Sequence, residues 1–202
     1  MNALYRKATF LLAAQKLNQL PAEFTHEVGF AGRSNAGKSS AINTITGIHS
    51  LARTSKTPGR TQQIVYFTLD EQRALVDLPG YGFAKVPPKV KEQWGRLMED
   101  YFQNRKQLKG LVLVMDVRHP LRDFDEQMLA WCHYHKVPVH ILLTKADKVS
   151  KNVGSSTRLQ VMKYIKEMGL EDAEVQLFSS LKRTGTETVV TKLNSWFEIE
   201  QN

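Results

Sequence analysis

The sequence predicts an α/β protein: a mostly parallel sheet of six strands, with one antiparallel edge strand and helices on both faces. Short apolar stretches alternate along the chain with segments whose apolar residues recur every three or four positions. Residues 110–117 and 137–143 are almost continuously apolar, which is typical of strands buried on both faces of a parallel sheet. Residues 64–69 and 73–78 are joined by a short turn at 70–72, so they are expected to pair antiparallel.

The predicted elements follow one another in a regular order. Strands are expected at 26–31, 64–69, 73–78, 110–117, 137–143 and 174–178, and helices at 40–47, 90–102, 120–136, 156–168 and 186–198. Residues 50–63 and 148–154 are expected to be loops. The 202 residues suffice for one domain, and no linker-like segment divides them. We therefore expect residues 1–25 to be an N-terminal extension packed on a single domain of residues 26–202.

Composition limits the compartment. No apolar run approaches the length of a membrane span, and the apolar patch at 8–14 is not followed by a signal-peptide cleavage site. Cys132 is the only cysteine, so the chain has no disulfide framework, in keeping with a reducing compartment. These features predict a cytoplasmic protein without a membrane partner.

The charge of the chain is basic and uneven. The formal net charge is +8, and the excess of lysine and arginine is concentrated at 50–63, 85–109 and 145–166. A basic surface beside a ligand site favours a polyanionic partner such as RNA. The alternative, a basic protein whose lysines are simply solvated, is left open by charge alone.

Residues Gly32–Ser39, with the sequence GRSNAGKS, match the phosphate-loop pattern G-x-x-x-x-G-K-[ST]. A predicted strand precedes the loop and a predicted helix follows it, which is the context that the pattern requires. Backbone N–H groups of the loop and the positive end of the helix would bind phosphate oxygens. Lys38 would neutralise the β- and γ-phosphates, and the Ser39 hydroxyl would ligate Mg²⁺.

A second motif, Asp77-Leu78-Pro79-Gly80, lies at the end of a predicted strand about forty residues after the phosphate loop. An aspartate in this place can hold Mg²⁺ through water, and the glycine lets a backbone N–H approach a γ-phosphate. Alone, D-x-x-G is a common turn. By contrast, Cys132, His133 and His135 do not share one helix face, so we do not expect a metal site there.

Together with Thr61, Thr144–Asp147 and Ser179–Ser180, these two motifs resemble the five motifs of a Ras-like GTPase domain over about residues 26–198. The segments GRSNAGKSS (32–40), KTPGRTQ (56–62) and DLPGYG (77–82) resemble more closely the EngB family of bacterial GTPases. The resemblance implies a Ras-like fold, GTP hydrolysis, and a monomer that binds the 50S ribosomal subunit through ribosomal RNA and protein. It also implies a role in assembly of that subunit, linked to cell division and septation.

The resemblance assigns roles to individual residues. Ser39, Thr61 and Asp77 would hold Mg²⁺, Thr61 only with GTP bound, and Gly80 would sense the γ-phosphate. Asp147 would accept hydrogen bonds from guanine N1 and N2, Lys145 would lie along the base, and the two serines would contact guanine O6. The residues expected to act in hydrolysis are Lys38, Thr61, Gly80 and Asn35. The whole set expected to bind the nucleotide is Gly32, Arg33, Ser34, Asn35, Ala36, Gly37, Lys38, Ser39, Ser40, Gly59, Arg60, Thr61, Gln62, Gln63, Asp77, Leu78, Pro79, Gly80, Thr144, Lys145, Ala146, Asp147, Phe178, Ser179 and Ser180.

The chain departs from the Ras-like pattern at two positions. Thr144 stands where the base motif usually has asparagine, which predicts modest nucleotide affinity. Tyr81 stands where Ras-type enzymes have a water-orienting glutamine, so intrinsic hydrolysis should be slow. Asn35 resembles the asparagine with which related GTPases bind K⁺ in place of an arginine finger.

Three functions compete at this point. The first is a GTP-driven switch acting on the ribosome, with Mg²⁺ and GTP or GDP bound and K⁺ as a further candidate ligand. The second is a nucleotide-stabilised RNA- or ribosome-binding module with negligible turnover, which Tyr81 keeps open. The third is an ATP-dependent P-loop kinase, against which the position of Asp147 argues because a carboxylate suits guanine and not adenine.

Overall fold

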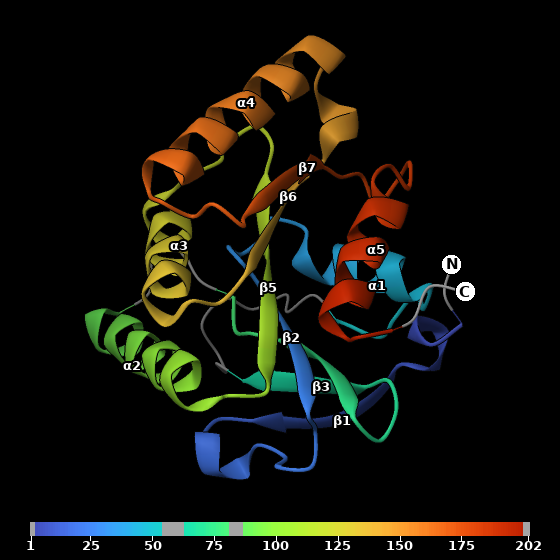
Figure 1. The fold of residues 1–202 in the computed structure, drawn as a ribbon, viewed down its shortest axis with the longest axis vertical. Helices are drawn as coiled ribbons and strands as arrows, with labels where there is room; N and C mark the ends of the chain where they lie inside the picture. Colours follow the sequence, from blue (N-terminus) through green and yellow to red (C-terminus); the bar gives the residue numbers. More distant parts are fainter. Residues whose placement is uncertain (1–2, 54–62, 81–86, 200–202) are drawn as a thin grey trace.

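A computed structural model describes residues 3–53, 63–80 and 87–199 of the chain. Within these residues it contains a seven-stranded sheet with helices on both faces (Figure 1). The strands are β1 (Thr9–Ala14), β2 (His26–Gly32), β3 (Ile64–Thr68), β4 (Arg73–Asp77), β5 (Leu108–Asp116), β6 (Val139–Thr144) and β7 (Glu174–Leu177). The helices are α1 (Lys38–Thr46), α2 (Pro88–Asn104), α3 (Asp123–His135), α4 (Lys151–Glu167) and α5 (Thr186–Trp196), with short 3₁₀ turns η1 (Tyr5–Lys7), η2 (Leu17–Gln19) and η3 (Ala146–Lys148).

The sheet order is β1-β3-β4-β2-β5-β6-β7. β2 pairs in parallel with β4 and β5, and β6 and β7 continue the parallel part. β3 runs antiparallel to both of its neighbours, β1 and β4. The predicted α/β class with a mostly parallel sheet is confirmed. The sheet has seven strands instead of six, and its antiparallel strand lies inside the sheet instead of at the edge.

The additional strand, β1, comes from the N-terminal extension. It pairs with β3 along its length, with an irregularity in register between Phe10 and Leu12. Most of its side chains are exposed, so it lacks the alternation of apolar and polar residues by which a half-buried strand is predicted from sequence. The pairing with β3 makes the strand, and the local sequence does not. The division into an extension and a domain at residue 25 stays a prediction.

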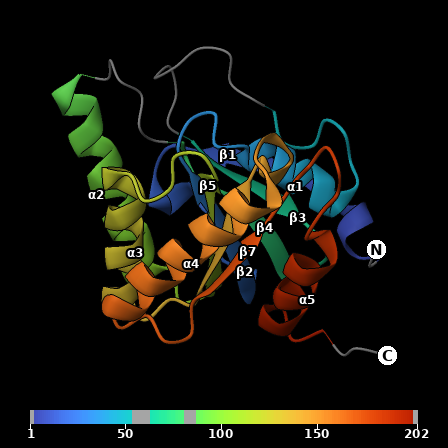
Figure 2. The same ribbon diagram turned by 90° about the horizontal axis from the view of Figure 1, so that it is seen from above.

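Two apolar layers hold the helices to the sheet. α2, α3 and α4 cover one face, where the buried side chains include Trp94, Met98, Leu129 and Ile165. α1 and α5 cover the other face, with Ile42, Ile45, Leu193 and Trp196 among its buried or nearly buried residues. Figure 2 shows these two groups of helices on opposite sides of the sheet. No helix in the described ranges is both long and apolar enough to cross a membrane.

Helix α4 begins earlier than the sequence indicates. The prediction placed a loop at 148–154 and a helix from 156, but α4 starts at Lys151. The Ser150 side chain accepts a hydrogen bond from Val153 N (3.3 Å), as an N-cap residue does. Gly154 appeared to extend the loop, but it is a buried helical residue. A β-carbon at this position would lie 3.1 Å from a Leu177 methyl group, so the glycine lets α4 pack closely on β7.

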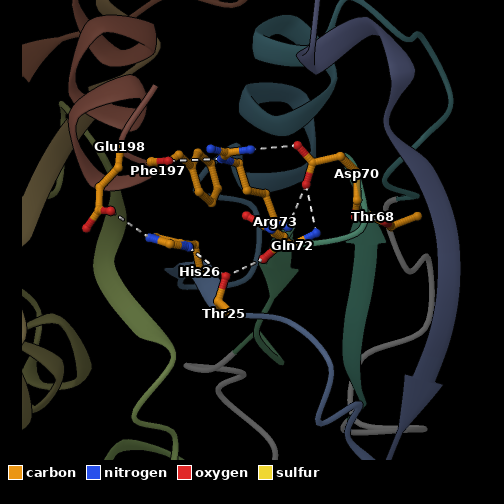
Figure 3. Close-up of polar contacts among 8 residues, drawn as sticks. All are labelled: Thr25, His26, Thr68, Asp70, Gln72, Arg73, Phe197 and Glu198. Atoms are coloured by element: carbon orange, nitrogen blue, oxygen red, sulfur yellow. Dashed lines mark hydrogen bonds and ion pairs between the residues drawn. The ribbon is translucent and has the colours of Figure 1, made fainter. Parts of the chain in front are cut away.

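The amino-terminal ends of β2 and β4 are tied to the carboxyl end of α5 (Figure 3). Arg73 pairs with Asp70 at 2.9 Å and donates a second hydrogen bond to Phe197 O, also at 2.9 Å. His26 lies 3.4 Å from the Glu198 carboxylate. These polar contacts lie at the amino-terminal ends of β2 and β4, away from the phosphate loop. The sequence motifs lie at the carboxyl ends of the strands.

Candidate functional site

The motifs follow the carboxyl ends of four parallel strands. β2 runs into the phosphate loop at Gly32, β4 ends at Asp77, and β6 ends at Thr144. β7 ends at Leu177, two residues before Ser179. Because the carboxyl ends of parallel strands lie along one edge of the sheet, residues up to 147 positions apart in the chain meet there. This is the edge at which open α/β sheets bind their ligands.

Two glycines of the phosphate loop are required by its geometry. A β-carbon at Gly32 would lie 2.8 Å from Val114 O, so only glycine allows the loop to leave β2 so close to β5. Gly37 has φ +99°, a left-handed conformation that glycine adopts without strain. Asn35 also has a positive φ of 64°, which asparagine tolerates better than most residues. The loop ends at Lys38, the first residue of α1, so the positive end of this helix faces the loop.

Lys38 and Asp77 form an ion pair across the site. Both side chains are nearly buried, with exposed fractions of 11% and 12%. Burial lowers the pKa of the Lys38 ammonium to about 7. The Asp77 carboxylate is the counter-ion that favours its charged form in this environment. The lysine of the phosphate loop and the aspartate of the D-x-x-G motif are therefore in direct contact. The roles predicted for them toward phosphate and metal stay predictions.

The segment after β4 lies against the phosphate loop. A β-carbon at Gly80 would lie 3.8 Å from Gly32 O and 4.0 Å from Ser34 N. The Trp94 indole of α2 donates a hydrogen bond to the carbonyl oxygen of Pro79 (3.2 Å) and so ties this segment to α2. The N–H-bearing backbone of Gly80 is thus placed beside the loop that would bind phosphate.

Thr144 connects the base motif to the phosphate loop. Its side chain is buried, and its hydroxyl lies within hydrogen-bond reach of two carbonyl oxygens, Ala36 O and Met115 O (3.0 Å). The sequence predicted only the loss of the asparagine amide at this position. The structure adds what the threonine does: it joins the end of β6 to the phosphate loop and to the end of β5.

Lys145 makes a second connection between the base motif and the phosphate loop. Its ammonium group donates to Asn35 O at 2.6 Å and pairs with the Asp116 carboxylate at 2.9 Å. Lys145 immediately precedes η3 and has a left-handed backbone conformation, with φ 57°. The hydrogen bond to Asn35 O places its side chain against the phosphate loop. Asp116 was not among the predicted site residues, although an acidic residue ending a buried strand was a usable signal.

Arg118 completes the environment of Asp116. Its guanidinium group donates to both carboxylate oxygens at 2.9 and 2.7 Å. Desolvation raises the pKa of Asp116, but the hydrogen bonds from Arg118 and Lys145 outweigh it and hold the pKa well below its usual range. Asp116 is therefore ionised at neutral pH and fixes the position of Lys145.

Asp147 faces Ser179 across the base end of the site. The Ser179 hydroxyl donates to Asp147 Oδ1 at 2.6 Å, and this hydrogen bond lowers the pKa of the carboxyl group. Ser179 is buried, and its oxygen also accepts from Lys182 N at 3.1 Å. Ala146 N donates to Phe178 O at 3.1 Å, which ties the loops after β6 and β7 together. The Asp147 carboxylate is thus ionised and held in place as an acceptor.

Other predicted binding residues are placed less directly. The Phe178 ring is completely buried in the core, so only its backbone is available to a ligand. Ser40 and Asn35 have exposed side chains, and Gln63 precedes β3 with a partly exposed one. Gly59, Arg60, Thr61, Gln62 and Tyr81 lie outside the described residues. The role predicted for each of these residues stays a prediction.

A cavity of about 230 Å³ lies on the flank of the phosphate loop, between the loop and the end of β5. Among the residues that line it are Arg33, Asp116, Arg118 and Lys145. The described residues of its wall do not include Lys38, Asp77 or Asp147. The cavity therefore adjoins the phosphate loop and the base motif through Arg33 and Lys145 but does not contain the Lys38–Asp77 pair.

The donor set near Lys38 suits Mg²⁺. Ser39 follows Lys38 at the start of α1, and Asp77 contacts Lys38 directly. A hydroxyl and a carboxylate are hard oxygen ligands of the kind that Mg²⁺ takes together with water and substrate phosphates. The residues present therefore fit a magnesium ion bound jointly with a nucleotide.

The fold and the site together define a Ras-like P-loop GTPase. A family model described as "50S ribosome-binding GTPase" matches residues 27–145. The chain is 52% identical over 196 residues to the "Probable GTP-binding protein EngB" of Coxiella burnetii (strain RSA 331 / Henzerling II), covering 97% of this chain and 95% of that protein. The chain belongs to the EngB family of GTP-binding proteins, as its motifs indicated.

Solved structures agree on the fold. A crystal structure of a probable GTP-binding protein engB superposes with a TM-score of 0.69 at 22% identity, covering 86% of this chain and 100% of that one. A bacterial selenocysteine-specific elongation factor, EF-Sec, superposes with a TM-score of 0.63 at 19% identity, over 88% of this chain and 29% of that one. At these identities the likeness concerns the fold alone.

Proposed function

We propose that this GTPase is a nucleotide-controlled switch with slow hydrolysis that acts as a cytoplasmic monomer in assembly of the 50S ribosomal subunit. The family description, which names 50S ribosome binding, supports the ribosomal partner. A link to cell division and septation belongs to the same proposal through the family resemblance. The observation that carries the switch is the convergence of Lys38, Asp77 and Asp147 at one sheet edge.

We propose that Lys38 moves its contact from Asp77 to the β- and γ-phosphates when GTP is bound. Asp77 then becomes available to a magnesium ion through water, together with the hydroxyls of Ser39 and Thr61. Magnesium supplies charge neutralisation between the phosphates. The N–H of Gly80, beside the phosphate loop, distinguishes GTP from GDP by its access to the third phosphate.

The base end accounts for guanine specificity in this proposal. An ionised Asp147 accepts two hydrogen bonds from guanine N1 and N2, and adenine offers no such pair of donors. Lys145, held by Asp116 and Asn35 O, lies along the base. A buried polar group left without its partner costs free energy, so the site rejects adenine strongly.

Slow hydrolysis follows from Tyr81, which has no amide to orient the attacking water. We propose that K⁺ bound at Asn35 supplies part of the missing charge stabilisation. The exposed side chain of Asn35 supports this, because among the described residues Lys145 bonds its backbone carbonyl and leaves the side-chain amide open. Hydrolysis rates measured in KCl and in NaCl test the proposal, and equal rates would refute it.

A ribosome-binding module with negligible turnover is the second candidate, and Tyr81 favours it. Single-turnover GTP hydrolysis, measured with and without 50S subunits, separates the two candidates. A switch predicts cleavage that the subunit accelerates. A module predicts no cleavage on the time scale of subunit binding.

The central experiment is co-sedimentation with 50S subunits in the presence of non-hydrolysable GTP, GDP or an ATP analogue. The switch predicts strong binding to the subunit with the GTP analogue and weaker binding with GDP. The ATP analogue should not increase binding above the level seen without nucleotide. Equal binding in all three conditions would rule out nucleotide control.

A further inference from the structure

Five exposed residues of α4 lie along one line of the helix: Lys151, Ser155, Arg158, Met162 and Lys166. Their spacing of three or four positions puts them on one helix face. At 1.5 Å per residue the line is about 22 Å long. Three of its side chains are cationic and none is acidic. We call this set the α4 stripe.

The cations of the α4 stripe have no ion-pair partner in the part of the chain that the structure describes. In the ranges that the structure describes, Lys151, Arg158 and Lys166 form no ion pair. Lys163, which lies on another side of the helix, differs because it pairs with Glu167 at 3.8 Å. The stripe is therefore a row of free cations.

Helix α4 presents this row from a fixed position. Its inner face is buried against the sheet through Gly154, Val161 and Ile165. The helix starts four residues after Asp147, so one end of the stripe is next to the base-binding end of the site. Figure 1 shows α4 at the periphery of the molecule, beside β7. The stripe is thus a preorganised surface.

A membrane surface fits α4 less well than a nucleic acid does. A helix that lies in a membrane interface needs one continuous apolar face. The apolar face of α4 is already buried, and its exposed apolar residues Val153, Leu159 and Met162 are spread over about 180° around the helix, so they form no continuous apolar face. Phosphate oxygens of nucleic acids accept hydrogen bonds from lysine, arginine and serine side chains. The α4 stripe offers all three types, with Ser155 supplying the hydroxyl.

We infer that the α4 stripe is a docking surface for the phosphate backbone of RNA. The inference rests on the proposed function and specifies it, since it assigns the contact with the large subunit to one helix. Binding through phosphates is independent of base sequence and depends strongly on salt.

Two triple variants of the full-length chain test the inference. The stripe variant is Lys151→Gln/Arg158→Gln/Lys166→Gln. The control variant is Arg6→Gln/Lys7→Gln/Lys16→Gln, which removes the same charge from exposed residues of the N-terminal segment. Binding to purified 50S subunits is measured with non-hydrolysable GTP at several KCl concentrations, and GDP affinity reports that each variant is folded.

The stripe variant is expected to bind the subunit at least about 10-fold more weakly than wild type, with a log–log salt dependence shallower by about 2–3. The control variant should behave like wild type. Protein-free RNA extracted from the large subunit should show the same difference between the two variants.

Four results would overturn the inference. Equal weakening of the two variants would show an effect of net charge alone. Unchanged binding by the stripe variant would remove α4 from the interface while leaving the proposed function standing. Loss of subunit binding without loss of binding to free RNA, or stripe-dependent binding to anionic lipid vesicles instead of RNA, would assign the surface to another partner. If wild type does not bind the subunit in any nucleotide state, the proposed function itself fails.

Discussion

At the scale of single residues, the site is built from side chains whose partners hold them in one state. Asp116 keeps Lys145 in place, and Ser179 does the same for Asp147. Each carboxylate has its pKa lowered by the groups that donate to it. Both acids therefore stay ionised across the neutral range, and their function as acceptors does not vary with pH there.

Replacing Asp147 by asparagine should exchange the base preference. An asparagine can accept one hydrogen bond and donate one, which matches the N1–H and O2 of xanthine instead of the two donors of guanine. We expect Asp147→Asn to lower GDP affinity by about 100-fold or more and to raise the affinity for xanthosine diphosphate. Titration calorimetry with both nucleotides measures this. Asp123→Asn, an exposed change on α3, should leave both affinities as they are.

Replacing Thr144 by valine should separate the role of its hydroxyl from that of its shape. The single hydroxyl proton can be donated to Ala36 O of the phosphate loop or to Met115 O of β5, and valine keeps the size of the side chain but removes this donor. We expect a loss of about 1 kcal/mol of stability, or about 2–4 °C in Tm for a chain of this size. Thr191→Val, at an exposed position of α5, is the matched control. Equal Tm changes for the two would contradict the role assigned to Thr144.

At the scale of elements, the packing of helices on strands depends on the positions of glycine residues. The Trp196 ring of α5 lies against Gly110 of β5, where a β-carbon would come within 2.5 Å of it. Gly95 of α2, by contrast, has open space at that position. Packing therefore requires glycine at position 110 of β5 but leaves room for a side chain at position 95 of α2.

Alanine at these two glycines should change stability in opposite directions. Gly110→Ala is expected to destabilise by about 1–3 kcal/mol because Trp196 must move away from β5. Gly95→Ala is expected to stabilise by about 0.5–1 kcal/mol because alanine favours the helix interior. Urea unfolding followed by circular dichroism measures both free energies. A loss at both positions would mean that the space beside Gly95 is filled.

A buried polar network fixes the relation of three other elements. Glu27 of β2 is completely buried, pairs with Arg105 next to α2, and accepts a hydrogen bond from Tyr66 of β3 at 3.1 Å. Arg105 also donates to Pro21 O at 2.7 Å, which brings in the segment before β2. The network joins β2, the strand that leads to the phosphate loop, to β3 and to the carboxyl end of α2.

At the scale of the whole molecule, a bound nucleotide is expected to raise the free energy of unfolding of the protein. The motifs of one site come from the ends of four strands, so a ligand that touches all of them links most of the sheet. A ligand that binds only the folded state stabilises it by mass action.

GDP with Mg²⁺ should therefore raise Tm in a specific way. At a free concentration 100 times its Kd, GDP should contribute about 2.7 kcal/mol, or roughly 5–10 °C. ATP at the same concentration should give no comparable rise, and EDTA should reduce the effect of GDP. Differential scanning fluorimetry with these additions measures the shifts. Equal stabilisation by ATP and GDP would contradict guanine specificity at Asp147.

The sequence by itself determined the fold class, the phosphate loop and the order of the motifs. These are local properties: Gly37 is needed for the left-handed backbone of one loop, and the periodicity of apolar residues reflects a single strand or helix. Membership of the EngB family was also predictable, because short motifs of fixed spacing carry it.

Only the tertiary structure decided the remaining features, because each depends on contacts between distant parts of the chain. β1 exists through its pairing with β3, more than fifty residues away, and its own pattern does not predict it. The hydroxyl of Thr144 meets Ala36 across 108 positions, and Glu27 meets Arg105 across 78. The close packing of α4 on β7 depends on Gly154, where a β-carbon would lie 3.1 Å from Leu177. A local pattern reports which element a segment can form, whereas the partner that a side chain meets is fixed only when the sheet brings the strand ends together.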